Sequence, residues 1–131
     1  MIAKHISSKN QSSNSYLRLI TYLLNKESVY ERVERVVISG CTTTELKFAT
    51  DEINFTQSRN TRAQSDKTYH LIISFDSKER PHDHVLDDIE RELCLALGFE
   101  EHQRISVAHS DTEHFHVHLA INKIHPYKLT I

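Results

Sequence analysis

The chain has 131 residues, of which 38% are hydrophobic and 26% are charged. This length fits one domain, and the apolar fraction is large enough for a core, which excludes a fully disordered chain. No stretch approaches the ~18 apolar residues that a membrane-spanning helix needs, and the N-terminus lacks the apolar block of a signal peptide. The two cysteines, Cys41 and Cys94, favour a reducing cytoplasm over a disulfide scaffold. A net charge of −2 gives by itself no reason to expect nucleic acid.

The first half of the chain predicts strands and helices in alternation. Met1–Ile6 is typical of a short edge strand, and Tyr16–Asn25 has the apolar spacing of a helix. The β-branched stretch Arg32–Cys41 predicts a second strand. Residues 42–45, Thr-Thr-Thr-Glu, are typical of a helix cap, and the helix that follows is expected to end near Gln57.

The second half continues the alternation after a polar loop. Thr68–Phe75 has the period of a half-buried strand. An apolar stripe between Pro81 and Gly98 predicts a helix, because Pro favours helix starts and Gly the C′ position. Arg104–His109 and Glu113–Ile124 predict the strands of a hairpin. The whole pattern predicts an α+β domain with a sheet of about five strands and two or three helices.

The near-neutral total charge hides an uneven distribution. Residues 1–26 carry four basic side chains and no acidic one, whereas the segment 76–101 carries nine acidic against three basic side chains. The loop 59–67 is also basic. An ordinary solvated surface accounts for the acidic helix.

Histidines are concentrated near the end of the chain, where six of the ten lie between positions 102 and 125. On a strand, His114, His116 and His118 share one face, and the apolar residues between them form the opposite, core face. His116 and His118 lie about 6.6 Å apart at strand rise, close enough to tilt toward one ion.

A third ligand is expected from the neighbouring strand, because the hairpin folds His109 back toward this face. Asp111 is placed in sequence to accept a ring N–H from a ligand histidine and to fix its tautomer. The alternative is a half-exposed strand whose polar face uses histidine without binding metal. We expect His114 to lie outside the first set of ligands, and His102 and His125 to be surface residues.

Tyr22 lies on the polar side of its predicted helix. At ~100° per residue, Tyr16 falls within the apolar arc, whereas Tyr22 lies outside it with Arg18 four residues earlier. A tyrosine exposed beside a cation can stack on bases, donate a hydrogen bond or act as a nucleophile, or it can be an ordinary surface residue. Tyr69 is expected on an apolar strand face, and Tyr30 and Tyr127 in loops.

The stretch His109–Pro126, which contains His116-Val117-His118, resembles motif III of the conjugative relaxases, in which two histidines flank one hydrophobic residue. Three further segments resemble these enzymes in register: Met1–His5, Asn60–Phe75 and Leu97–Arg104. The chain is therefore similar, over its whole length, to the His-hydrophobe-His endonuclease superfamily, and within it to the IncP-type TraI and P-type mobilisation family.

The resemblance implies a site- and strand-specific DNA nicking-joining enzyme that acts at the transfer origin of a conjugative or mobilisable element. Tyr22 then attacks the scissile phosphate, which gives a 5′-phosphotyrosyl adduct and a free 3′-hydroxyl. His109, His116 and His118 hold a divalent cation, Mg²⁺ or Mn²⁺, and imidazole ligands would also admit Zn²⁺ or Ni²⁺. A role for His116 as general base toward the tyrosine is the alternative. The fold implied is an antiparallel sheet with the histidines on its central strands.

The resemblance also implies the partners and the extent of the chain. Single-stranded origin DNA is the expected substrate, and the resemblance of Ser74 to a serine of the family's second motif implies that Ser74 contacts DNA beside the nick. We further expect DNA contacts from Arg18, Arg62, Lys67, Asn122 and Lys123. Relaxosome accessory proteins and a type IV secretion coupling protein are expected partners of a cytoplasmic protein that is exported with its DNA. Because relaxase domains continue beyond motif III, residues 1–131 are expected to be a C-terminally truncated catalytic domain.

Two other functions compete with this interpretation. A non-catalytic DNA-binding or regulatory module would keep the fold without the chemistry. A small metal-dependent phosphoesterase would need paired His-x-Ser/Thr motifs, which His116-x-His118-x-Ala120 does not supply.

Overall fold

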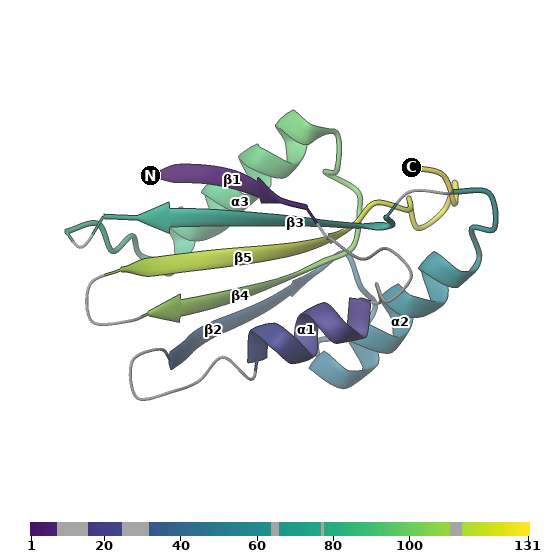
Figure 1. Ribbon diagram of the computed structural model, residues 1–131, viewed down its shortest axis with the longest axis horizontal. Helices are drawn as coiled ribbons and strands as arrows, with labels where there is room; N and C mark the ends of the chain where they lie inside the picture. Colours follow the sequence, from purple (N-terminus) through teal and green to yellow (C-terminus); the bar gives the residue numbers. More distant parts are fainter. Residues whose placement is uncertain (8–15, 25–31, 64–65, 77, 111–113) are drawn as a thin grey trace.

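The computed structural model describes residues 1–7, 16–24, 32–63, 66–76, 78–110 and 114–131. Its strands form one antiparallel sheet in the order β1-β3-β5-β4-β2 (Figure 1). The strands are β1 (Ile2–Ile6), β2 (Arg32–Ser39), β3 (Thr68–Phe75), β4 (Arg104–Ser110) and β5 (Phe115–Asn122). The helices are α1 (Tyr16–Leu24), α2 (Leu46–Ser58) and α3 (Asp83–Leu97). The predicted α+β class is confirmed, and β1 is the expected edge strand.

Helices cover the two faces of the sheet. Figure 1 shows α1 and α2 on one side and α3 on the other. Under α3, Leu86 packs against Val117 and its neighbours, and under α1, Ile20 packs against Val107 and Ala120. The prediction that β5 has a single core face is therefore wrong: α1 and α2 also bury much of its histidine face.

Tyr16 fastens α1 to the two strands of the hairpin. Its hydroxyl donates to the Ala120 carbonyl oxygen at 2.5 Å and accepts from the Ile105 N–H at 3.0 Å. Complete burial raises the pKa of Tyr16 well above its ordinary value, so the hydroxyl stays protonated and remains a donor. The predicted core position of Tyr16 is confirmed.

The residues that end α3 and begin α2 can be compared with the predicted helix caps. Gly98 ends α3 with φ of 81°, a left-handed conformation that favours glycine, as the C′ prediction required. At the start of α2 the expected cap differs, because Glu45 occupies the N-cap position without a side-chain bond. The Glu52 carboxylate instead accepts from the Thr42 N–H at 3.1 Å. None of the described helices is long and apolar enough to cross a membrane.

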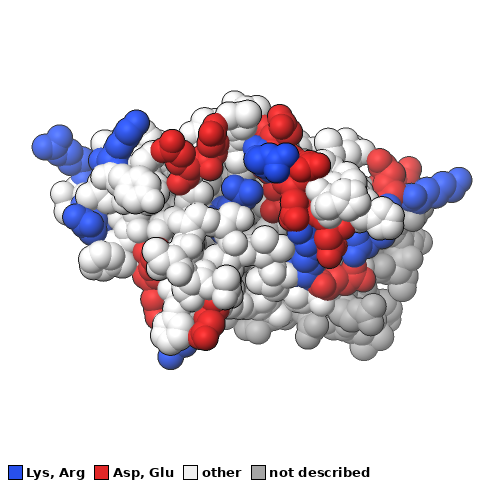
Figure 2. All heavy atoms as spheres, turned by 180° about the vertical axis from the view of Figure 1, so that it is seen from behind, with Lys and Arg blue, Asp and Glu red and all other residues white. Residues whose placement is uncertain are grey.

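The face that carries α3 is rich in acidic side chains (Figure 2). Its exposed carboxylates on α3 include Asp83, Asp87, Asp88 and Glu92. From β2, the nearly buried Arg35 reaches this helix and pairs with Glu90 at 3.0 Å and with Asp87. A polyanion is repelled by exposed carboxylates, so this face is unfavourable for a polyanionic ligand.

Candidate functional site

The three predicted ligand histidines share the sheet face that α1 and α2 cover. On β4 and β5, His109 lies directly opposite His116, and Val107 lies opposite His118. Directly opposed residues have Cβ atoms about 4.5–5.5 Å apart, so His109 and His116 are neighbours on this face. The expected placement of these histidines on the central strands is confirmed.

His109 connects the sheet to the last turn of α1. Its Nε2–H donates to the Leu23 carbonyl oxygen at 2.6 Å, and the side chain is fully buried. Because a carbonyl only accepts, Nε2 carries the ring proton and Nδ1 keeps its lone pair. That Nδ1 is buried and has no hydrogen-bond partner among the described residues.

His118 is almost completely buried beside two other imidazoles. Its ring lies edge-on to that of His109, with centroids 4.9 Å apart. Its Nδ1 lies 2.9 Å from Nε2 of His70 on β3, so one proton is shared between these two nitrogens. When His118 Nδ1 carries that proton, Nε2 is the unprotonated nitrogen of the neutral His118 ring.

His116 lies beside Ser74, one of the predicted DNA contacts. Its Nδ1 lies 3.3 Å from Ser74 Oγ, because Ser74 and His116 are opposed on β3 and β5. Within the described part of the chain, no three His, Cys, Asp or Glu side chains converge closely enough to hold a metal ion. The donor chemistry nevertheless fits a divalent cation, since His109 has a buried nitrogen without a hydrogen-bond partner among the described residues and its ring lies edge-on to the His118 imidazole, with centroids 4.9 Å apart. Asp111 lies outside the described residues, and its role stays a prediction.

Four tyrosines are described, and they differ in their access to this face. Tyr22 is 57% exposed on α1 and immediately precedes Leu23, whose carbonyl oxygen His109 holds. Tyr16 is buried, and Tyr69 packs on the other face, stacked on the His5 ring at 4.2 Å. Tyr127 is exposed but lies beyond the end of β5 that is remote from His116. Tyr30 lies outside the described residues.

The residues predicted to contact DNA differ in their solvent exposure and in their hydrogen bonds. Arg18 and Arg62 are exposed, and Lys123 is half-buried after β5. The Lys67 ammonium donates to the carbonyl oxygens of Gln57 and Asn60 at 3.0 and 2.6 Å, so it is engaged at the end of α2.

The structure corrects the prediction for Asn122. This side chain has no exposed surface, and its amide donates to Gln103 Oε1 at 3.0 Å while its oxygen accepts from the Ile124 N–H. A side chain without exposed surface cannot contact DNA directly, and Asn122 instead shapes the end of β5.

Sequence reasoning missed three histidines. His70 shares the face of Ser74 by strand alternation, a signal that was present in the sequence. His102 and His125, expected at the surface, are buried. His102 Nδ1–H donates to the Asn122 carbonyl oxygen at 2.8 Å, and burial lowers the pKa of His102 below its ordinary value. His125 Nε2 lies 2.7 Å from Glu101, so these two imidazoles support the C-terminal turn.

An antiparallel sheet between helices, with histidines on its central strands beside a helix that carries an exposed tyrosine, is the arrangement expected of a relaxase nuclease domain. The sequence of residues 22–131 matches the relaxase family described as MobA/VirD2-like, nuclease domain. The chain belongs to this family.

Individual relatives agree with this assignment. Two Escherichia coli proteins named TraI are 41% and 42% identical to the chain over all of its 131 residues. The chain spans 18% of the length of each. The MobA protein of Acidithiobacillus ferrooxidans is 33% identical over 66 residues, which are 50% of this chain and 16% of that protein. No solved structure matches the chain closely enough to count as a relative.

Proposed function

We propose that this chain nicks and rejoins one strand of origin-of-transfer DNA for a conjugative or mobilisable element, with Tyr22 as nucleophile and His109, His116 and His118 as ligands of a divalent cation. One observation carries the proposal. His109, whose free Nδ1 is a candidate ligand atom, is bonded at 2.6 Å to the carbonyl oxygen of the residue that follows Tyr22. This hydrogen bond connects the candidate metal ligand to the last turn of α1, the helix that carries the candidate nucleophile.

The chemistry is a transesterification that conserves the phosphodiester bond. The Tyr22 phenol oxygen attacks the scissile phosphorus, and the bond from phosphorus to the 3′ oxygen breaks. The phosphate stays on Tyr22 and on the 5′ end, and the 3′ oxygen leaves as a hydroxyl after it accepts a proton. Attack by the freed 3′-hydroxyl reverses the step and rejoins the strand. Bound Mg²⁺ or Mn²⁺ supplies a Lewis acid at a phosphate oxygen.

The protein residues orient the substrate and the ligands. In this proposal Ser74 Oγ, which lies 3.3 Å from His116 Nδ1, donates to a phosphate oxygen near the nick. Whether His116 acts as ligand or as base, Ser74 lies within reach of its Nδ1. We assign His70 a positioning role: its Nε2 lies 2.9 Å from His118 Nδ1, and if His118 donates this hydrogen bond, the His118 Nε2 would be the nitrogen that could bind a cation.

The proposal is tested by incubating the protein with single-stranded origin DNA and Mn²⁺ and resolving covalent protein–DNA complexes on a denaturing gel. We expect a covalent band that EDTA abolishes and that added Mn²⁺ restores. A band that is unaffected by EDTA would contradict the metal site. DNA binding without any covalent band would favour the non-catalytic module.

Replacement of His70 tests the proposed ligand orientation. For His70→Ala we expect Mn²⁺ affinity, measured by calorimetry without DNA, to fall about 10- to 100-fold because His118 loses its orienting partner. The variant His70→Gln keeps a side-chain acceptor and should lose less. As a control, His82→Ala removes an exposed imidazole at the start of α3 and should bind Mn²⁺ like the wild type. Equal affinities for all four proteins would exclude the positioning role.

Accessory proteins of the relaxosome, a type IV secretion coupling protein and export with the DNA remain predictions from the family resemblance. In the proposal these partners act after nicking, when the nicked strand is transferred.

A further inference from the structure

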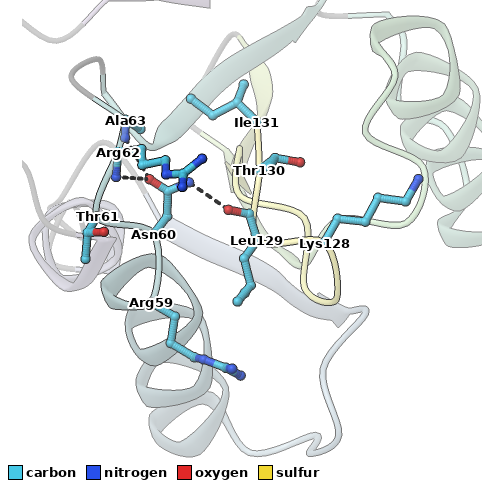
Figure 3. A pocket seen from close by; sticks show the side chains of 9 residues that line it. All are labelled: Arg59, Asn60, Thr61, Arg62, Ala63, Lys128, Leu129, Thr130 and Ile131. Carbon is cyan, nitrogen blue, oxygen red and sulfur yellow. Dashed lines mark hydrogen bonds between the residues drawn. The ribbon is translucent and has the colours of Figure 1, made fainter.

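A pocket of about 420 Å³ lies at the end of the sheet remote from His116. Its walls are the loop 59–63 after α2 and the C-terminal segment 128–131 (Figure 3). Arg59, Arg62 and Lys128 extend on different sides of its centre, and none of its nine lining residues is acidic. In Figure 2, Lys and Arg side chains gather at the left end, which is the end of the C-terminus.

Hydrogen bonds hold the two walls together. Asn60 Oδ1 accepts from the backbone N–H groups of Arg62 and Ala63, and Asn60 Nδ2 donates to the Leu129 carbonyl oxygen at 2.7 Å. On the second wall, His125 Nδ1 accepts from the Lys128 N–H at 3.1 Å. Glu101, an acid near Lys128, lies 2.7 Å from His125 Nε2. These hydrogen bonds fix the backbone of the two segments that carry Arg59, Arg62 and Lys128 without a bound ligand.

An aromatic ring adjoins this pocket. The Arg59 guanidinium lies 5.9 Å from the centroid of the Phe55 ring, and Phe55 is 63% exposed on α2. Cations that hold phosphates beside an exposed aromatic ring that stacks a base form the combination that binds single-stranded nucleic acid without reading its sequence. Inorganic phosphate would use the cations but not the ring.

The sheet register sets the distance between this pocket and the candidate nicking site. The β3–β5 pairing runs from Thr68–Asn122, near the pocket, to Ser74–His116, at the histidines. Six residues of strand span about 20 Å. That distance corresponds to about six nucleotides at the 3.4 Å spacing of a duplex strand, and to fewer in an extended single strand.

We propose that Phe55, Arg59, Arg62 and Lys128 form a second contact for single-stranded DNA, which holds one or two phosphates and a stacked base a few nucleotides from the scissile phosphate. The position of the scissile phosphate rests on the proposed function. The contact itself does not, because it depends on the charge and the aromatic ring of this end alone.

Binding of a labelled single-stranded oligonucleotide as a function of salt tests the proposal. For the double variant Arg59→Ala/Arg62→Ala we expect the slope of log affinity against log salt to become less steep by about 1.4, because each phosphate that the protein no longer neutralises lowers the slope by about 0.7. For Phe55→Ala we expect affinity to fall about 5- to 150-fold. Wild-type slope and affinity in these variants would overturn the proposal.

Two variants outside the pocket serve as controls for the loss of a ring and for the loss of a charge. Phe48→Ala removes another exposed ring, 54% accessible, seven residues earlier on α2, and Arg91→Ala removes an exposed arginine of α3. We expect wild-type binding from these variants, and losses as large as those of the pocket variants would contradict a localised contact. Thermal unfolding of every variant establishes that each remains folded.

Two further measurements separate the alternatives. An oligonucleotide that extends only one or two nucleotides on either side of the nick, too few to reach the pocket even as an extended single strand, should bind the wild type and the double variant alike. Inorganic phosphate that occupies the pocket while Phe55→Ala leaves DNA affinity unchanged would identify a small-anion site and overturn the DNA contact. Absence of a covalent adduct in the wild type would refute the nicking proposal while leaving the binding result intact.

Discussion

The variant Tyr22→Phe is expected to form no covalent adduct with origin DNA and to leave supercoiled origin plasmid unnicked. Phenylalanine keeps the ring and the helix but lacks the oxygen that attacks phosphorus. Because Tyr22 is exposed, the substitution should not affect stability, and DNA binding should remain close to that of the wild type. A denaturing gel with labelled oligonucleotide measures the adduct, and a filter or anisotropy assay measures binding.

The matched control is Tyr127→Phe, which changes another exposed tyrosine at the remote end of the sheet. We expect this variant to form the wild-type amount of adduct. An adduct that persists in Tyr22→Phe and disappears in a Tyr30→Phe variant would assign the nucleophile to Tyr30 instead. An adduct that survives in every tyrosine variant would refute tyrosine chemistry.

The variant Arg35→Ala is expected to lower the free energy of unfolding by about 3–5 kcal/mol. Arg35 is nearly buried and pairs with Glu90, whose side chain is 2% exposed, so the substitution leaves a buried carboxylate without its closest cation. Urea unfolding followed by circular dichroism measures the loss. The exposed pair of Arg91 and Asp88 provides the control, since Arg91→Ala should cost at most about 1 kcal/mol.

The loss in Arg35→Ala should depend on pH in a defined direction. Burial already raises the pKa of Glu90 above its ordinary value, and Arg35 opposes that rise, so its removal raises the pKa further. A carboxyl group with a raised pKa in the folded state favours folding at low pH, and this contribution disappears as pH rises through the folded-state pKa. The deficit relative to wild type should therefore shrink as the pH is lowered. A double variant Arg35→Met/Glu90→Met should recover most of the stability, and failure to recover would show that packing, not charge, explains the loss.

The fold was largely predictable because its signals are local. Period-two alternation located β3 and β5, and Gly98 marked the end of α3, since each depends on residues adjacent in sequence. The burial of the histidine face was not predictable, because it depends on α1 and α2 packing across a sheet whose strands come from distant segments. The same cause explains the error at Asn122, whose polar side chain is satisfied internally by Gln103.

The candidate site was predictable in its residue types but not in its connections. Alternation placed His116 and His118 on one face, and motif resemblance added Ser74, which lies beside His116. The partner of His118 was missed because His70 lies 48 positions earlier, and only strand pairing brings these two rings together. The hydrogen bond from His109 to α1 could not be predicted either. Its acceptor is the backbone carbonyl oxygen of Leu23, and the pattern of side chains in the sequence does not identify backbone acceptors.

That last bond has a consequence for how the domain tolerates mutation. The Leu23 carbonyl oxygen belongs to the peptide backbone, so no replacement of the Leu23 side chain removes the acceptor as long as α1 keeps its helical path. Among side-chain substitutions at the two bonded residues, only one at His109 removes this hydrogen bond. This single codon specifies both a candidate ligand and the anchor of the helix that carries Tyr22, whereas position 23 can drift among apolar residues that fill the same space.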